Sequence, residues 1–174
     1  MKKNFYAVVT ILFCFCIIQA VAQSADEEKV QAVIQRAGDA WKAHDYSFSV
    51  KYDIYTSNAV LVNPVGMYWK SRSQIISGIQ QFAPMMFQNE STKYNIKELR
   101  FLAPAVALVI VHSIDRVERD YNLPTGEKGG RKGDTTEAMY TYTLVKSDKN
   151  WKIASLQVTK IDLNAAPSNP FKDN

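Results

Sequence analysis

The sequence contains little cysteine and little histidine, and each shortage excludes a class of chemistry. Its two cysteines are Cys14 and Cys16, and its two histidines are His44 and His112. Both cysteines lie in a segment that reads as a removable leader, so the rest of the chain has no thiol for a disulfide, a catalytic thiolate or a cysteine metal site. Two isolated histidines, with no His-Glu-x-x-His motif, predict that the chain holds no metal.

Other motifs of common enzyme classes are missing as well. The glycine-rich stretch Gly126–Asp134 has no glycine followed by Lys-Ser or Lys-Thr, which argues against a phosphate-binding loop. No Gly-x-Ser-x-Gly elbow of a serine hydrolase is present. With 7 glycines and 6 prolines among 174 residues, and 47% apolar residues, the composition is that of an ordinary globular domain. We therefore predict one folded domain that uses no cofactor.

The beginning of the chain has the layout of a bacterial signal peptide. Lys2 and Lys3 precede an apolar run at residues 5–18, and Ala20 and Ala22 place small residues before a cleavage point. The alternative is a retained membrane anchor, but the run is shorter than the ~20 residues that span a bilayer. We expect residues 1–22 to be removed and the protein to be periplasmic or secreted, with no attachment to the membrane afterwards.

Loss of this leader also changes the charge of the protein. The whole chain has 21 Lys and Arg against 17 Asp and Glu, a net charge of +4. Removing Lys2 and Lys3 leaves 19 against 17, so the net charge falls to +2. The excess positive charge that would favour nucleic-acid binding is therefore small, and we expect no nucleic-acid partner.

The first part of the remaining chain has the periodicity of helices. Apolar residues three and four positions apart predict one helix over Asp26–His44. Asp45 is placed to cap a second, shorter helix that ends near Tyr55. A Ser-x-x-Gln capping box, which starts at Ser71, predicts a third helix that is kinked or ended by Pro84.

The second part has the alternating pattern of strands. A short strand at 59–62 and a possible returning strand at 67–69 are followed by four longer ones, at 94–102, 106–118, 135–146 and 151–161. Helices followed by antiparallel strands indicate the α+β class. We interpret residues 23–163 as one domain and residues 164–174 as a flexible tail.

Several short motifs resemble the nuclear transport factor 2-like superfamily, which includes the SnoaL-like and ketosteroid-isomerase-like proteins. They are the stretch Asn58–Gly66 with Lys70–Ile75 after it, Trp41-x-x-x-Asp45 before it, and Trp151-Lys152-Ile153 with Gln157-x-Thr159 near the end. The resemblance implies a cone-shaped curved antiparallel sheet wrapped around three N-terminal helices, with a pocket between them. It also implies a homodimer formed through the outer face of the sheet. Strands 106–118 and 135–146 support this, because they carry apolar residues on both faces.

The resemblance also shows what this sequence lacks as an isomerase. Asn63 occupies the position of the family's aspartate base, and an amide cannot accept a proton at neutral pH. The first helix reads Gln35-Arg36-Ala37 where the isomerase has its oxyanion-binding tyrosine. Gln157 stands where relatives often carry a histidine. His112 reads as a core or dimer-face residue, and Asp45 as a helix cap.

Two functional hypotheses remain. The first is a secreted binding protein for a small apolar or aromatic molecule, without chemistry of its own. The second is a SnoaL-like enzyme that uses acid–base catalysis for isomerisation, cyclisation or hydrolysis of a small organic substrate. The sequence assigns no catalytic residue. For either function we expect an apolar pocket with two amide anchors, lined by Trp41, Tyr55, Asn63, Phe82, Met86 and Gln157.

Overall fold

The computed structural model describes residues 23–47, 51–123 and 125–162. The expected leader and the expected tail lie outside these ranges, as do residues 48–50 of the expected second helix and the side chain of Met86. The described residues form an N-terminal helix over 23–42, a second long helix, and six strands in one sheet. The α+β class is confirmed, but a third N-terminal helix is not.

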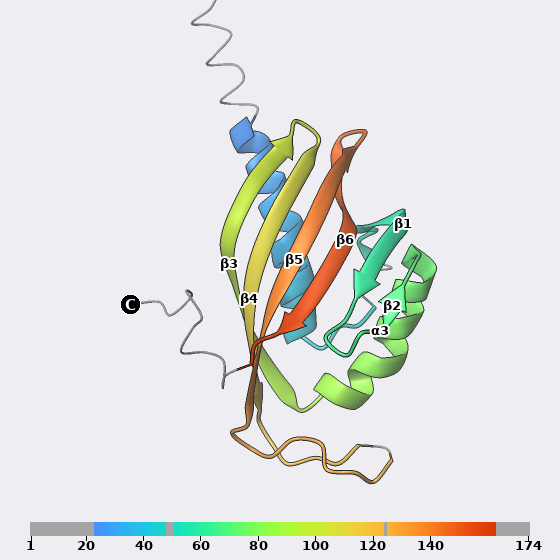
Figure 1. Cartoon of the computed structure of the whole chain (residues 1–174), viewed down its shortest axis with the longest axis vertical. Helices are drawn as coiled ribbons and strands as arrows, with labels where there is room; N and C mark the ends of the chain where they lie inside the picture. The colour runs from blue at the N-terminus through green and yellow to red at the C-terminus, as the bar shows by residue number, and fades with distance from the viewer. Residues whose placement is uncertain (1–22, 48–50, 124, 163–174) are drawn as a thin grey trace, which may run out of the picture.

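The strands form one curved, unclosed sheet in the order β2-β1-β6-β5-β4-β3 (Figure 1). The long strands β3, β4, β5 and β6 pair antiparallel with their neighbours, whereas β1 runs parallel to β6. The sheet is therefore mixed, not wholly antiparallel as the sequence predicted. The strands are bounded by Tyr55–Val62 (β1), Tyr68–Trp69 (β2), Glu90–Ala103 (β3), Val106–Val117 (β4), Thr135–Ser147 (β5) and Asn150–Lys160 (β6).

Both helices lie at the inner face of the sheet. The N-terminal helix passes behind β3–β6 in Figure 1, and α3 (Arg72–Phe87) lies beside β1 and β2. The N-terminal helix buries one stripe of side chains, as its apolar spacing predicts. These residues pack against sheet residues in one core: Val30, Val33, Ile34 and Ala37 from the helix, with Val109, Val111, Leu144 and Ile153 from the sheet.

The start of α3 shows how the sequence fixes the position of this helix. Ser71 is its N-cap, and the Ser71 hydroxyl accepts from the amide of Gln74 at 3.3 Å. The side chain of Gln74 returns to accept from the amide of Lys70, one residue before the N-cap, at 2.9 Å, so Ser71 and Gln74 form a variant of the expected capping box. Pro84 lies inside the helix, which continues to Phe87. Of the two predicted effects of Pro84, a kink or an end of the helix, the end is therefore excluded.

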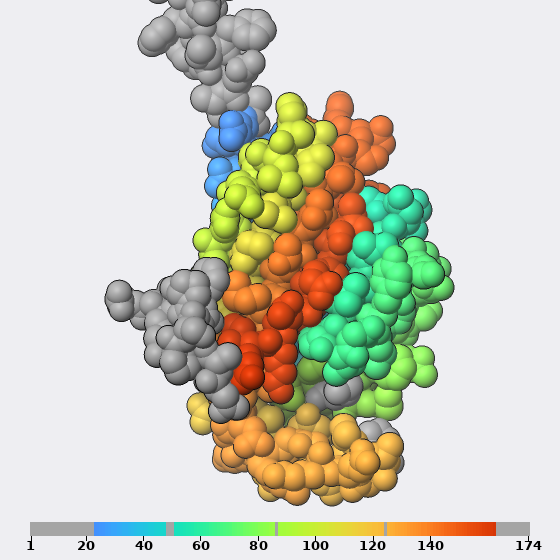
Figure 2. All heavy atoms as spheres, in the orientation of Figure 1, coloured from blue at the N-terminus to red at the C-terminus, as the bar shows by residue number. Residues whose placement is uncertain are grey.

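The opposite face of the sheet carries a second set of apolar side chains. On β4, residues on this face alternate with fully buried ones and are themselves half-buried. Figure 2 shows the described part of this face as a broad surface with no helix over it. Its apolar members include Leu108, Ile110, Ile114, Met139 and Val145.

Candidate functional site

A cavity of about 390 Å³ lies between the inner face of the sheet and the two helices. The N-terminal helix contributes Trp41, α3 contributes Phe82, and the curved sheet contributes side chains from β1, β3, β4, β5 and β6. A sheet that curves around two helices leaves a space which their side chains do not fill. This volume falls within the range of small-molecule pockets, roughly 300–1,000 Å³.

Much of the cavity wall is aromatic. Trp41 packs against Phe87 and Tyr46, with ring centroids 5.2 and 5.3 Å apart. Trp69 of β2 lies against α3 at Gly78, where an added Cβ would come within 2.7 Å of the indole ring. Gly78 therefore allows the ring to lie against the helix backbone and form part of the wall.

Polar groups gather in one part of the cavity, which we call its polar end, and Glu90 at the start of β3 is their first member. The Tyr121 hydroxyl donates to the Glu90 carboxyl at 3.0 Å, and the Nε2–H of His44 donates to the Glu90 carbonyl oxygen at 2.9 Å. Partial burial raises the pKa of Glu90 above its ordinary value. The hydrogen bond from Tyr121 opposes that rise, and the nearby Asp115 adds to it.

The glycine-rich loop holds Tyr121 in place. A Cβ on Gly129 would lie 2.5 Å from the Tyr121 ring, and one on Gly130 would lie 2.6 Å from Val117 and 2.8 Å from the Tyr121 ring. Glycine is needed at both positions because the loop passes so close to this ring. This glycine-rich stretch, in which the sequence contains no phosphate-loop motif, thus has a structural role beside Tyr121.

Asp115 of β4 is the second carboxyl group of the cavity. Its side chain faces inward, and only 8% of the residue is exposed. Thr92, its partner across β3 and β4, donates a 2.6 Å hydrogen bond from Oγ1 to Asp115 Oδ1. Burial raises the pKa of Asp115, while Thr92 and Ser113 hold it down in part. Among the described residues, neither Asp115 nor Glu90 forms an ion pair.

Buried tyrosines continue the polar wall. The Tyr94 and Tyr140 rings lie 5.5 Å apart, and their hydroxyl groups share a hydrogen bond. Burial raises the pKa of Tyr140 to about 12 and that of Tyr142 well above its ordinary value. These hydroxyls therefore keep their protons at neutral pH and are available as hydrogen-bond donors.

Four of the six residues predicted from the sequence line this cavity. They are Trp41, Tyr55, Asn63 and Phe82. The Asn63 Oδ1 atom accepts from the amides of Val65 and Met67, at 3.1 and 2.8 Å, so its main contacts stabilise a turn. Tyr55 belongs to β1 and not to a helix, because β1 begins four residues earlier than the sequence predicted.

Gln157 does not line the cavity, and an irregularity in β6 is the reason. Thr143 of β5 pairs with Ser155, but Leu144 pairs with Ile153, so Ala154 is an extra residue in β6. An extra residue reverses the alternation of faces. Trp151 and Ile153 point inward before it, and Leu156 and Val158 point inward after it, which leaves Gln157 exposed on the other face. The prediction that Gln157 lines the pocket assumes that inward-facing and outward-facing residues alternate without a break along β6.

The other polar candidates have structural contacts. Asp45 Oδ1 accepts from the Ser47 hydroxyl and amide, at 2.6 and 3.2 Å. His112 lies on the outer face of β4, with its Nε2 atom 2.7 Å from Glu137 Oε2, and it does not line the cavity.

The polar end of the cavity was missed in the sequence analysis. For Asp115 a signal existed, because Ser113 and Asp115 share a strand face with the apolar Val109 and Val111. Two polar residues on an otherwise apolar strand face indicate a functional site, because polar residues are seldom buried. Glu90 lies at a strand end, and Tyr121 lies in an irregular loop, so no periodic pattern marks either residue.

Two classes of feature are not found in the part of the chain that the structure describes. No group of three or more metal-ligating side chains is present within residues 23–47, 51–123 and 125–162. None of the helices in these ranges is long and apolar enough to cross a membrane.

Comparison with solved structures identifies the fold. An uncharacterized protein with a cystatin-like fold from Caulobacter vibrioides is 26% identical, with a TM-score of 0.70 over 83% of this chain and 95% of that one. An NTF-2 like protein of unknown function from Shewanella oneidensis is 18% identical, with a TM-score of 0.58 over 77% and 98%. The hexachlorocyclohexane dehydrochlorinase LinA-type3 from Novosphingobium barchaimii is 14% identical, with a TM-score of 0.65 over 82% and 91%.

The chain therefore has the nuclear transport factor 2-like, or cystatin-like, fold, and the resemblance found in the sequence is confirmed at this level. No protein-family model matches the sequence, and no match is found among curated proteins. The structural neighbours include both an enzyme and proteins without an assigned activity, so function must be argued from the cavity.

Proposed function

We propose that this protein binds a small, largely apolar molecule in the cavity. The observation that carries the proposal is the lining itself, in which aromatic rings from both helices and the sheet surround about 390 Å³ and polar groups gather at one end. Burial of a ligand's apolar surface supplies affinity, and a few placed hydrogen-bond groups fix its orientation. A neutral aromatic or alicyclic molecule with one polar substituent matches this lining, with its ring on the apolar wall and its substituent at the polar groups.

The cavity also supports a second candidate function, acid–base catalysis on the bound molecule. The supporting observation is the pair Glu90 and Asp115, whose pKa values are raised and which have hydroxyl donors beside them. Carboxyl groups with raised pKa values in a cavity are candidates for proton transfer. Asn63 leaves the family's base position empty, but these two groups would supply a base from another part of the sheet. LinA, which shares the fold, is a dehydrochlorinase of a chlorinated cyclohexane.

The three tryptophans provide a direct test of binding. Trp41 and Trp69 line the cavity, and Trp151 does not. We expect 2-naphthol to shift the indole N–H signals of Trp41 and Trp69 in a ¹⁵N NMR titration and to leave that of Trp151 unchanged. Phe82→Ala should weaken binding about tenfold through lost apolar contact. Leu102→Ala, at a residue 57% exposed on β3, is the matched control and should bind as the wild type does.

A negative result in either the NMR titration or the comparison of the two variants would contradict the binding proposal. Absence of shifts at Trp41 and Trp69 would show that the cavity does not take such ligands. Equal loss in Phe82→Ala and Leu102→Ala would place the ligand elsewhere. Mass spectrometry of any molecule retained through native purification would identify the physiological class.

Binding and catalysis are separated by substitution of Asp115. For a bound ketone with an acidic C–H group, we expect the wild type to catalyse exchange with deuterium from D₂O if the second function holds. Asp115→Asn keeps the shape and the acceptor for Thr92 Oγ1 but cannot take a proton. It should therefore abolish exchange and retain binding. Exchange at the wild-type rate in Asp115→Asn would exclude Asp115 as the base.

We also propose export and dimerisation. Export is supported by the sequence of residues 1–22, and the native product should have the intact mass of a chain that starts at Gln23. Dimerisation is supported by the half-buried apolar side chains on the outer face of β4 and β5. Light scattering should give about twice the chain mass, and a strict monomer would contradict this proposal.

A further inference from the structure

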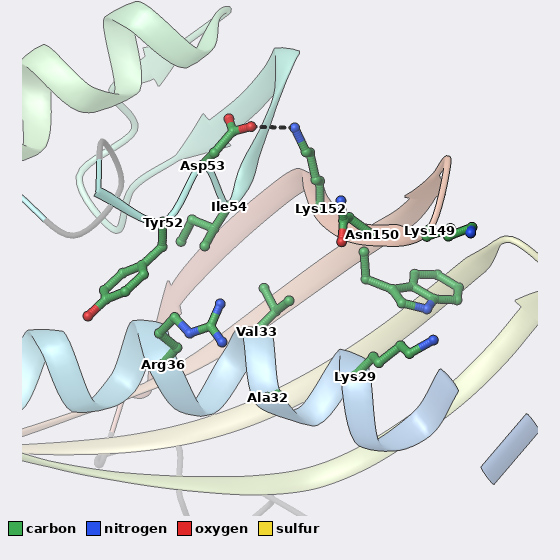
Figure 3. A pocket seen from close by; sticks show the side chains of 11 residues that line it. Lys29, Ala32, Val33, Arg36, Tyr52, Asp53, Ile54, Lys149, Asn150 and Lys152 are labelled. Atoms are coloured by element: carbon green, nitrogen blue, oxygen red, sulfur yellow. Dashed lines mark hydrogen bonds and ion pairs between the residues drawn. The ribbon is translucent and has the colours of Figure 1, made fainter. Parts of the chain in front are cut away.

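A second pocket, of about 330 Å³, is lined by residues of the N-terminal helix that lie nearer its beginning than Trp41 does. Figure 3 shows that its side chains come from three separate segments: the N-terminal helix, residues 52–54 and the hairpin between β5 and β6. It shares no lining residue with the cavity described above. The fold therefore presents two separate concavities, one on each half of the same helix.

Positive charge dominates this second pocket. Lys29 and Arg36 come from the helix, Lys149 and Lys152 come from the hairpin, and Asp53 is the one acidic residue that lines it. These segments are far apart in the sequence, so the fold itself places the four cations around one pocket. Like charges held at one surface repel one another, and an anion bound between them would relieve that repulsion.

The acidic residue that lines this pocket already forms ion pairs with neighbouring side chains. Asp53 accepts from Lys152 Nζ at 2.6 Å and also contacts the Arg72 guanidinium. The hydrogen bond from Lys152 is the largest cause of the lowered pKa of Asp53, so its charge is committed to these partners at neutral pH. Among the described residues, Arg36 and Lys149 form no ion pair.

Lys29 has only a distant acidic partner. Its Nζ atom is 3.9 Å from Asp26 Oδ1, whereas Lys146 Nζ lies 2.6 Å from Asp26 Oδ2 and the Trp151 indole N–H donates to Oδ1 at 3.2 Å. Asp26 is thus held mainly by Lys146 and Trp151. Lys29 lines the pocket at its side nearer the beginning of the helix (Figure 3).

The floor of the pocket is apolar. Val33, Ile54 and Trp151 line it and are 9%, 2% and 3% exposed. Tyr52 adds an aromatic ring at the edge, with the Arg36 guanidinium 5.2 Å from its centroid. A pocket of this volume with an apolar floor and a cationic rim has room for more than an inorganic ion.

We propose that this pocket binds a small organic phosphate, with the phosphate group at Arg36 and the lysines and the organic group on the apolar floor. A guanidinium presents two parallel N–H donors that match phosphate oxygens, and lysines add charge around it. The proposal is independent of what the cavity binds, because the two pockets share no residue.

Phenyl phosphate is the probe that tests it, and Trp151 is the reporter. In a ¹⁵N NMR titration of the full mature protein, we expect phenyl phosphate to shift the Trp151 indole N–H signal and to leave those of Trp41 and Trp69 in place. Phenol should produce no shift at Trp151, and inorganic phosphate should bind more weakly because it makes no contact with the floor. Raising NaCl from about 0.05 M to about 0.5 M should weaken binding strongly.

Charge-removing variants locate the site. Arg36→Gln and Lys149→Gln should each weaken phenyl phosphate binding about tenfold. Both side chains are exposed, so the fold should be retained, and a melting curve checks this. Lys93→Gln removes an exposed lysine of β3 outside both pockets and should leave the affinity unchanged.

Four results would overturn the proposal. The first is no shift of the Trp151 signal, and the second is a shift confined to Trp41 and Trp69, which would place the phosphate in the cavity. The third is an equal loss in Lys93→Gln and Arg36→Gln, which would indicate unspecific attraction to a basic protein. Benzoate that binds as tightly as phenyl phosphate would show a general anion site and would contradict the assignment to phosphate.

Discussion

Carboxyl groups at two places in this molecule have opposite properties. In the cavity, Glu90 and Asp115 have raised pKa values because burial disfavours their charge, and the hydrogen bonds from their hydroxyl partners offset only part of this rise. Beside the second pocket, Asp26 and Asp53 have lowered pKa values, and the largest cause for each is a hydrogen bond from a lysine. The cavity thus favours carboxyl groups that hold protons, and the second pocket favours carboxylates that hold cations in position.

This difference shows how one fold can build two unlike sites. Without a cationic partner, a partly buried carboxyl group costs stability at neutral pH and gains the ability to exchange protons. An ion-paired carboxylate adds a modest amount of stability and little reactivity. By this argument the cavity is the better place for chemistry, and the second pocket is a place for binding charge.

The largest expected effect comes from filling the cavity wall. Gly78→Ala would place a Cβ within 2.7 Å of the Trp69 ring, which must then move. We expect the free energy of unfolding to fall by about 1–2 kcal/mol, and 2-naphthol to bind less tightly, because overpacking outweighs the gain in helix propensity.

Gly38 offers the matched control. It lies in the N-terminal helix, and an added Cβ would be 3.4 Å from the Tyr94 ring, an ordinary contact. Gly38→Ala should therefore stabilise the protein by about 0.5–1 kcal/mol in chemical denaturation. Equal destabilisation by both substitutions would show that contact with the neighbouring ring is not the cause.

A smaller loss is expected when the paired carboxylate Asp26 is neutralised. A group whose folded pKa is lowered contributes stability above its unfolded pKa of 3.8, and this contribution disappears as the pH falls through the folded value. Asp26→Asn should lower the free energy of unfolding by about 1 kcal/mol at pH 7 and by almost nothing near pH 2. Urea titrations at both pH values test this, and an equal loss at both would show that charge is not responsible.

The cavity carboxyl Asp115 should respond in the opposite direction. Its folded pKa is raised, so the folded state keeps a proton that the unfolded state loses as the pH rises above 3.8. Stability is therefore lost over that interval. Asp115→Asn should raise the free energy of unfolding by up to about 1 kcal/mol at pH 8 and leave it unchanged near pH 3. A variant that is less stable than the wild type at pH 8 would contradict the assignment of a desolvated carboxyl group.

The sequence predicted most of the fold because the fold depends on periodic patterns. The stripe on the first helix, the Ser71 capping box and the long alternating strands all gave elements close to those observed. The parallel pairing of β1 and β6 was missed, since it joins residues far apart in the sequence and no local pattern marks it.

The site was predicted only in part, for an equally physical reason. Trp41 and Phe82, which were predicted on helices, and Asn63, which was predicted at a turn, line the cavity because helix spacing and a short turn determine where they point. Gln157 was misplaced because a single extra residue, Ala154, reverses the faces of β6, and the sequence around it still alternates. Glu90 and Tyr121 come together only through the path of the glycine loop.

Asp53 provides the smallest effect and the sharpest separation of stability from binding. Its side chain is 49% exposed, so its ion pairs with Lys152 and Arg72 are screened by solvent, and Asp53→Asn should change the free energy of unfolding by no more than about 0.5 kcal/mol. Asp53 has a positive φ of 48°, a conformation that asparagine adopts as readily as aspartate, so no backbone strain is added.

The substitution Asp53→Asn also removes the one acidic side chain that lines the second pocket and frees Lys152. Phenyl phosphate should therefore bind several-fold more tightly to Asp53→Asn than to the wild type, while 2-naphthol binding in the cavity stays the same. Weaker phosphate binding in this variant would mean that Asp53 positions Lys152 for the ligand, and the cations would then depend on their carboxylate partner instead of competing with it.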